Sequence, residues 1–196
     1  MSEVLTTERL ELRPFSPEDA EAFQRLAGDW DVARMTSDIP HPLGFDQALR
    51  WLEPAEDEHR FAILRHGTLI GGAGYFLRPS GVAELGFWLG HEYWGQGYAT
   101  EATRAVLAHG FTQSRYPTFS SSHFVDNPAS KRVLEKLGFE PAGFGRIWSS
   151  ARGTDVEAAL YWLTRARAAM FLDLPPEAER PGRLGALLSR IAGTFF

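Results

Sequence analysis

The stretch Trp94–Ala102 contains the residues whose types and spacing most directly suggest chemistry. Gly95 and Gly97 stand at alternate positions after a strand-like pattern, and a helical pattern begins directly behind them. The first N–H groups of a helix have no intrahelical acceptor and together carry a positive charge of about half a unit. Because glycines leave the backbone bare, these groups can converge on one anion. The stretch therefore predicts a phosphate cradle made by six consecutive residues, namely Gly95, Gln96, Gly97, Tyr98, Ala99 and Thr100.

Two nucleotide-binding motifs are excluded for this turn. The P-loop pattern G-x-x-x-x-G-K-[ST] does not occur, so the turn lacks a phosphate-binding lysine. The dinucleotide pattern G-x-G-x-x-G fails because Thr100 stands at its third glycine, where the hydroxyl could instead add a donor. Glycine spacing alone favours an ordinary tight turn between a strand and a helix, so a second motif is needed.

The second stretch is Val125–Phe139, which follows the pattern of a strand end, a short helix and a new strand. Asn127 is a good helix N-cap with Pro128 at the first helical position, and Gly138 is typical of a helix end. Ser130 lies one turn into the helix. Taken singly, capping accounts for Asn127 and a surface position accounts for Ser130.

Composition removes several classes of chemistry. The 196 residues include no cysteine, which excludes disulfides, thiolate metal sites and a cysteine nucleophile. The six histidines lack paired ligand spacing on a helix, so no metal site is expected. The serine-nucleophile pattern G-x-S-x-G is also missing.

Charge and hydropathy bear on partners and location. The formal net charge of −5 disfavours a nucleic-acid partner and is compatible with a cationic one, although solubility explains the same charge. No apolar run reaches the roughly 20 residues of a membrane span, and Met1–Arg9 lacks a signal-peptide core. We therefore expect no membrane partner and a cytoplasmic protein.

The elements that must hold these motifs follow from the hydrophobic periodicity. Strand-like and helix-like segments alternate, which predicts an α/β domain with a mixed sheet. The expected strands are Leu5–Phe15, Phe61–Arg65, Thr68–Arg78, Val82–Gly90, Thr118–Phe124, Phe139–Ser149 and Asp155–Thr164. The expected helices are Ser16–Gly28, Phe45–Glu58, Ala99–Gln113 and Pro128–Leu137, with an irregular segment over Asp29–Gly44.

The C-terminal residues differ in character from the rest. We expect one domain over residues 1–167 and an extension over residues 168–196, which Pro175-Pro176 and Pro181-Gly182 interrupt. Leu184–Phe196 has the spacing of a short amphipathic helix. It could pack on its own domain, mediate a dimer or fray, and the first is the leading interpretation.

Together, the motifs resemble the GNAT superfamily of acyl-CoA-dependent N-acyltransferases, and most closely the branch of ribosomal-protein N-terminal (Rim-type) acetyltransferases. The resemblance runs from about Thr6 to Arg165. It is carried by the opening Thr7-Glu8-Arg9-Leu10-Glu11-Leu12-Arg13, the run Trp94–Ala102, the run Asn127–Phe139, and Ser150-Ala151-Arg152-Gly153 before the last strand.

The resemblance implies a single GNAT-like domain that takes acetyl-CoA as co-substrate. Its mixed central sheet would splay between the parallel strands Ala83–Gly90 and Thr118–Phe124, with helices on both faces. Backbone groups of Phe87, Trp88 and Leu89 would pair with the pantetheine arm, and the cradle would hold the pyrophosphate. Asn127 would bond the pantetheine and Ser130 would lie near the sulfur.

Two positions depart from the family pattern. Trp94 stands where Gln or Arg is common, which matters little because backbone amides do most of the holding. Leu134 stands where many members have the tyrosine that protonates the leaving thiolate. Ser130 thereby becomes the candidate proton donor, with solvent as the alternative.

With no cysteine, direct attack of an amine on the thioester is the simplest mechanism. The amine must lose a proton, since reference pKa values are about 10.4 for lysine and about 7.7–8.0 for an α-amine. Glu84 is the first candidate base, His123 the second and water a third, while a backbone N–H near Leu89 could stabilise the developing oxyanion.

The acceptor is not determined by these residues: a protein N-terminus and a small-molecule amine both fit. The segments Asp29–Gly44 and Phe144–Thr154 are expected on the acceptor side. A non-catalytic CoA-binding sensor and an interaction protein acting through its hydrophobic tail are the alternatives, and a homodimer fits the architecture.

Overall fold

The computed structural model describes residues 4–53, 55–78, 81–113 and 117–174. The strands are β1 (Leu5–Thr6), β2 (Glu11–Pro14), β3 (Glu58–Arg65), β4 (Thr68–Leu77), β5 (Ala83–Leu89), β6 (Thr118–Phe124), β7 (Glu140–Ser149) and β8 (Thr154–Thr164). The α-helices are α1 (Ala20–Ala27), α2 (Trp30–Ala33), α3 (Phe45–Leu52), α4 (Tyr98–Gln113), α5 (Pro128–Lys136) and α6 (Arg165–Ala168). Two single 3₁₀ turns, η1 (Pro17–Asp19) and η2 (His91–Tyr93), precede α1 and α4.

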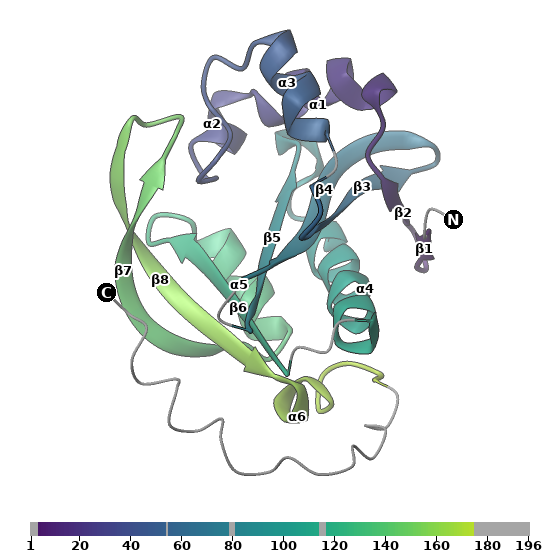
Figure 1. Ribbon diagram of the computed structural model, residues 1–196, viewed down its shortest axis with the longest axis vertical. Helices are drawn as coiled ribbons and strands as arrows, with labels where there is room; N and C mark the ends of the chain where they lie inside the picture. Colours follow the sequence, from purple (N-terminus) through teal and green to yellow (C-terminus); the bar gives the residue numbers. More distant parts are fainter. Residues whose placement is uncertain (1–3, 54, 79–80, 114–116, 175–196) are drawn as a thin grey trace.

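The strands form one sheet in the order β1-β2-β3-β4-β5-β6-β8-β7 (Figure 1). Neighbouring strands are antiparallel except β5 and β6, which are parallel. β7 and β8 form a long curved hairpin at one side of the molecule (Figure 1). The predicted α/β fold with a mixed sheet is confirmed.

The two faces of the sheet bury different side chains and are covered by different helices. On β3, Phe61 and Ile63 belong to one buried cluster, which includes α4 and α5, whereas Ala62 and Leu64 belong to the other, which includes α1 and α3. This alternation is the period-2 pattern of a strand buried on both faces. The prediction of helices on both faces is confirmed.

The N-terminal prediction was wrong in one respect. Leu5–Phe15 was expected as one strand, but β1 and β2 are two short antiparallel strands joined by a turn. In that turn the N–H of Thr7 donates to Leu10 O at 2.9 Å, and the N–H of Leu10 donates to Thr7 Oγ1 at 3.1 Å. A threonine hydroxyl that accepts from a nearby backbone N–H favours such a turn over a continuous strand.

Two predictions for the chain between α1 and β3 also differ. α3 ends at Leu52 rather than at Glu58, and Glu53 is extended with φ −60° and ψ 131°. That conformation is the one favoured for a residue that precedes a proline, here Pro54. The segment expected to be irregular contains α2, where the side chain of Asp29 caps the helix by accepting from the N–H of Asp31 at 2.8 Å.

The end of the described chain continues to pack on the domain. Ala168 and Leu172 are buried in the same cluster as α4 and α5, and the ring of Phe171 lies against Gly138. The boundary expected after residue 167 therefore falls inside α6. The predicted helix Leu184–Phe196 lies outside the described residues.

Candidate active site

The candidate site begins where the parallel strands β5 and β6 separate. Each strand has seven residues, but only Ala83 pairs with Phe119 and Glu84 with Ser120. The opposite edge of β5 is paired with β4 along its whole length. Beyond Glu84, β5 therefore has one edge that is not paired with a neighbouring strand, and the expected splay is confirmed.

The free edge of β5 has a definite hydrogen-bonding pattern. The hydroxyl of Ser121 on β6 donates to Leu85 O at 3.0 Å, so the backbone groups of Leu85 face the gap. Because these groups alternate along a strand, those of Phe87 and Leu89 face the gap too, whereas those of Trp88 face β4. The indole Nε1–H of Trp94 donates to Leu89 O at 2.8 Å, which occupies that carbonyl.

The glycine turn follows directly at the end of β5. Gly95 and Gly97 have φ values of 75° and 84°, in the left-handed region where L side chains are strained. α4 starts at Tyr98, and the N–H of Glu101 donates to Gly97 O at 3.1 Å. The N–H groups of residues 98–100 precede this bond and are left for an external acceptor. The turn thus has the local geometry that its sequence predicted.

Glu101 is a carboxylate in the first turn of α4, close to this cradle. Burial alone would raise the pKa of Glu101, but hydrogen bonds from the Thr7 hydroxyl and from the N–H and guanidinium of Arg9 outweigh it, so the pKa lies below its usual value. The carboxylate is therefore held ionised and paired.

The start of α5 places the second motif beside the same gap. Asn127 caps the helix, since its Oδ1 accepts from the N–H of Ser130 at 3.1 Å. The cap uses the oxygen of the amide and leaves its Nδ2 free to donate elsewhere. Leu134 is fully buried in the core cluster of α4 and α5, so its side chain packs rather than reacts.

The two candidate bases project from opposite faces of the sheet. Glu84 is paired with Ser120, whereas His123 lies three residues further along β6, on the other face. Both ring nitrogens of His123 have partners, with Nδ1 at 2.7 Å from Phe124 O and Nε2 at 3.4 Å from the Tyr161 hydroxyl. Glu84 Oε2 accepts from Arg78 at 2.7 and 2.9 Å.

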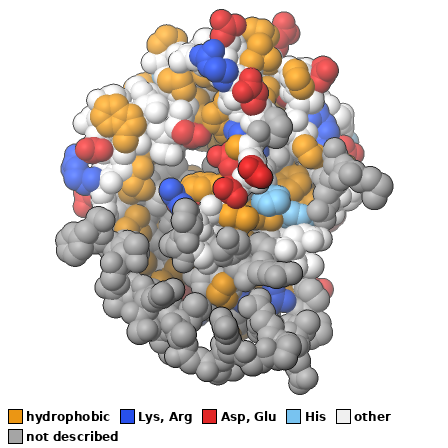
Figure 2. All heavy atoms as spheres, viewed as in Figure 1, with side chains coloured by type: hydrophobic (Ala, Val, Ile, Leu, Met, Phe, Trp, Pro, Cys, Tyr) orange, Lys and Arg blue, Asp and Glu red, His pale blue; other side chains and the backbone are white. Residues whose placement is uncertain are grey.

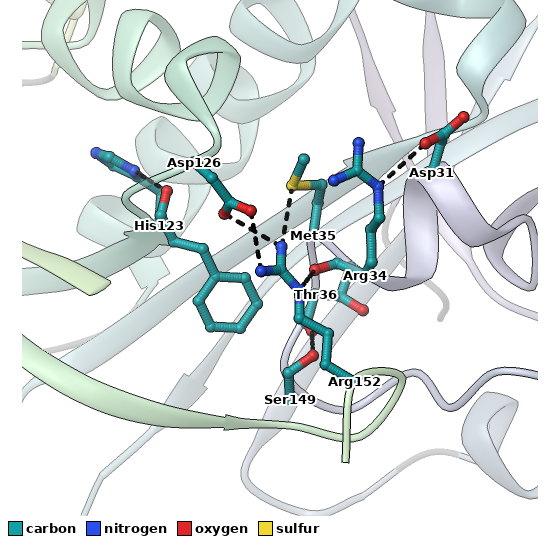
Figure 3. A network of polar contacts seen from close by, with 9 residues as sticks. Asp31, Arg34, Met35, Thr36, His123, Asp126, Ser149 and Arg152 are labelled. Atoms are coloured by element: carbon teal, nitrogen blue, oxygen red, sulfur yellow. Dashed lines mark hydrogen bonds and ion pairs between the residues drawn. The ribbon is translucent and has the colours of Figure 1, made fainter. Parts of the chain in front are cut away.

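A bridge of polar contacts crosses from the loop after α2 to the β7–β8 hairpin (Figure 3). We define it as residues 34–37 together with residues 149–152 and name it the acceptor bridge, because both segments were expected to face an acceptor. The N–H of Ser150 donates to Ser37 O at 2.9 Å, and the hydroxyl of the buried Ser149 lies 3.4 Å from Thr36 O. These contacts join two segments that are far apart in the sequence.

Arg152 is the centre of the bridge (Figure 3). Its Nε donates to Arg34 O at 2.8 Å, and its terminal nitrogens contact both oxygens of Asp126 at 2.9 and 3.1 Å. The guanidinium also lies 5.1 Å from the ring centroid of Phe124. One side chain thus ties together the loop after α2, the end of β6 and the hairpin. Sequence reasoning quoted Arg152 in a motif but assigned it no role.

Two kinds of feature are absent among the described residues. Within them, no three His, Asp or Glu side chains gather in a way that could hold a metal ion. The helices of the same residues are too short or too polar for any of them to cross a bilayer.

The shape of the chain matches solved acetyltransferases. A GNAT-family acetyltransferase from Bacillus anthracis aligns with a TM-score of 0.72 at 22% identity, covering 83% of this chain and 98% of the other. RimL, a ribosomal L7/L12 α-N-protein acetyltransferase solved with coenzyme A, aligns with a TM-score of 0.72 at 18% identity, covering 83% and 98%. RimJ from Mycobacterium smegmatis, solved with CoA-disulfide, has a TM-score of 0.72 at 19% identity, covering 86% and 91%. At these identities the likeness establishes the acetyltransferase fold.

Sequence similarity takes the assignment from the fold to the family. The pattern of the acetyltransferase (GNAT) domain matches residues 9–140, about two thirds of the chain. The uncharacterized N-acetyltransferase p20 of Bacillus licheniformis is 28% identical over 172 residues, covering 83% of this chain and 97% of the relative. The uncharacterized N-acetyltransferase YoaA of Bacillus subtilis is 29% identical over 176 residues, covering 85% and 99%. The chain belongs to the GNAT acetyltransferase family, and it is an enzyme of that class.

Proposed function

We propose that the enzyme transfers the acetyl group of acetyl-CoA to a primary amine by direct attack of the amine on the thioester. One observation carries the proposal: β5 separates from β6 after two residue pairs and leads straight into a glycine turn with unpaired amides. A strand edge with free backbone groups beside an anion cradle fits a ligand that has an amide-rich arm and a diphosphate.

The coenzyme contacts follow from this geometry. The amides of residues 95–100 would hold the diphosphate. Phe87 would pair with the pantetheine arm through its gap-facing backbone groups, and Leu89 through its N–H alone, since Trp94 occupies its carbonyl. Trp88, also expected to pair through its backbone, would instead contribute packing, because its side chain is buried against Phe23. A backbone N–H near Leu89 was also expected to donate to the thioester oxygen, but Leu89 and Glu84 are five residues apart on β5, about 16 Å along an extended strand, so this N–H does not act on the thioester that Glu84 would serve.

The leaving side of the reaction would be served by α5. Asn127 would donate its free Nδ2 to the pantetheine while its oxygen caps the helix. When the thioester C–S bond breaks, the sulfur leaves as a thiolate and takes up a proton. Ser130 would supply that proton, with solvent as the alternative donor, since Leu134 cannot.

The attacking side would be served by Glu84. The amine must give up a proton as its nitrogen bonds the carbonyl carbon, and Glu84 would accept it, directly or through a water. His123 is the weaker candidate because both of its ring nitrogens are already engaged. In the resting structure Arg78 bonds one carboxylate oxygen of Glu84, and the carboxylate would work from its other oxygen.

The acceptor would be an amine that is protonated in solution and binds beside the acceptor bridge. Several acidic side chains gather in the upper half of the face shown in Figure 2. Together with the formal net charge of −5, this surface would attract an ammonium group before it loses its proton. A protein N-terminus and a small-molecule amine both satisfy this requirement.

The test combines binding with turnover. Isothermal titration calorimetry with CoA and acetyl-CoA should give saturable binding at one site, and a thiol-release assay over a panel of N-terminal peptides and small amines should identify an acceptor. Absence of CoA binding would overturn the proposal. Binding of CoA with no turnover on any amine would replace it with the sensor interpretation.

A further inference from the structure

We propose that Arg9 is a positioning residue that holds the glycine turn in its anion-binding conformation. The inference rests on the proposed function, because it concerns how the same turn grips the diphosphate. Arg9 lies in the turn between β1 and β2, far in sequence from the residues that it contacts. It belongs to the opening motif of the sequence, for which no role was assigned.

Arg9 is attached to the first turn of α4 by a dense set of contacts. Its backbone N–H donates to Glu101 Oε1 at 2.9 Å, and its Nε donates to Oε2 at 2.7 Å. Its Nη2 lies 2.6 Å from the same Oε2, and the hydroxyl of Thr7 donates to Oε1 at 2.6 Å. The guanidinium also lies 4.6 Å from the ring centroid of Tyr98. These contacts fix the guanidinium against the start of the helix.

The remaining nitrogen reaches the backbone of the glycine turn. Arg9 Nη1 donates to Gln96 O at 3.1 Å. Because a trans peptide is planar, its C=O and the following N–H point in opposite directions. Holding Gln96 O toward Arg9 therefore turns the N–H of Gly97 away from Arg9 and leaves it available to the cradle.

The local chain does not fix that peptide by itself. Gln96 lies between two glycines, both with positive φ, and glycine populates positive and negative φ about equally. Rotation of this peptide would aim a carbonyl oxygen at the place of the diphosphate and withdraw a donor. Arg9 holds the peptide in the orientation that binds an anion.

The same guanidinium also neutralises a carboxylate that lies close to the cradle. Glu101 places a carboxylate within the first turn of α4, where it would repel a bound diphosphate. Arg9 pairs with that carboxylate through two nitrogens, and the side chain of Glu101 is only 16% exposed. The pair therefore leaves the positive end of the helix effective toward a ligand.

The experiment compares Arg9→Gln with Arg65→Gln. Arg65 is the matched control, since its guanidinium lies over the same Tyr98 ring at 5.4 Å but comes from β3. We expect Arg9→Gln to weaken CoA binding roughly 10-fold in calorimetry, the size of one hydrogen bond to a charged group, and Arg65→Gln to bind like the wild type. Arg9→Lys keeps the charge without the planar fork and should recover only part of the affinity.

A second ligand separates positioning from a general loss of structure. Pantetheine has the arm of CoA without its diphosphate, so its affinity should be equal in Arg9→Gln and the wild type, with melting temperatures recorded for each variant. Equal CoA affinity in Arg9→Gln and the wild type would overturn the role of Arg9, and so would an equal loss for CoA and pantetheine. Failure of the wild type itself to bind CoA would instead overturn the proposed function.

Discussion

The two sides of the proposed site are built in opposite ways. On the coenzyme side, the glycine turn and the cap at Asn127 are each a few consecutive residues at the junction of a strand and a helix. On the acceptor side, the bridge joins residues 113 and 118 positions apart in the chain, namely Ser149 with Thr36 and Arg152 with Arg34. The groups that would face the ligand are local in sequence on the coenzyme side, with the distant Arg9 as their support, whereas the acceptor side is made by tertiary contact.

The difference bears on what each side can recognise. The coenzyme side offers mainly backbone groups, whose positions depend on φ and ψ and little on side-chain identity. Such a site binds one constant ligand and tolerates wide sequence change, as expected for a family whose relatives here are under 30% identical along most of their length. The acceptor side offers side chains on loops, which is where specificity is usually varied.

The largest expected effect tests the coenzyme side. Gly97→Glu should weaken CoA binding by more than about 1,000-fold, because it strains the turn by about 1–2 kcal/mol and puts a carboxylate beside the diphosphate. Space is not the cause, since a Cβ at Gly97 would come no nearer than 3.4 Å to Arg9 Nη2. Calorimetry with CoA measures the effect.

A matched glycine serves as the control for strain alone. Gly67 has φ 76° in the β3–β4 turn, and a Cβ there would meet nothing within 4 Å. Gly67→Glu should lower the melting temperature by a comparable amount and leave CoA affinity within a factor of about three. If Gly97→Glu binds CoA as tightly as Gly67→Glu does, the coenzyme site is not at this turn.

The second effect concerns the chemistry between the two sides. Glu84→Gln should lower kcat about 100-fold, the range for loss of a general base, while the affinity for CoA stays unchanged. Arg78→Gln is the control, because it breaks the same ion pair and keeps the carboxylate. Steady-state kinetics with saturating acetyl-CoA measure both variants.

The pair of variants separates catalysis from structure. If Glu84 acts only as the partner of Arg78, the two substitutions should change kcat to the same small extent. That result would remove Glu84 from the mechanism and return the role of base to water or His123.

The sequence indicated the local geometry of the glycine turn and of the cap at Asn127, and it indicated the segments of the proposed acceptor side only in outline. Gly95, Gly97 and Asn127 act through their own backbone or the next turn, so their residue types indicate their conformation directly. Arg9 and Arg152 act on partners far along the chain, and an arginine has the same local signature whether it binds a distant carbonyl or water. The turn at Thr7 was missed because the alternation of Leu10 and Leu12 with charged residues, which lies on the β2 side of the turn, was extended back to Leu5.

The third effect, of intermediate size, tests the acceptor side. Arg152→Gln should destabilise the protein by about 1–2 kcal/mol and raise the KM for the acceptor several-fold, because the loop after α2 loses its tie to the hairpin. The affinity for CoA should stay within a factor of about two. Arg146→Gln on β7 is the control, since within the part of the chain that the structure describes Arg146 bonds to its own hairpin, at Asp155 O. If Arg152→Gln weakened CoA binding by the same factor as it raised the KM for the acceptor, the two sides would not be separate.

The smallest effect is a pH dependence that belongs to the coenzyme side. The pKa of Glu101 is below its usual value in the folded protein, so its stabilising contribution is complete above the unfolded pKa, near about 4.3, and is lost as the pH falls through the folded pKa. Chemical denaturation at pH values from 7 down to 3 should therefore show that the free energy of unfolding falls less in Glu101→Gln than in the wild type. The difference should be less than about 1 kcal/mol for so small a network. Glu92→Gln is the control, because the ion pair of Glu92 with Arg25 is exposed on both sides and should contribute little. If the free energy of unfolding falls equally at low pH in wild type and Glu101→Gln, the pairing of Glu101 with Arg9 adds nothing to the stability of the folded state.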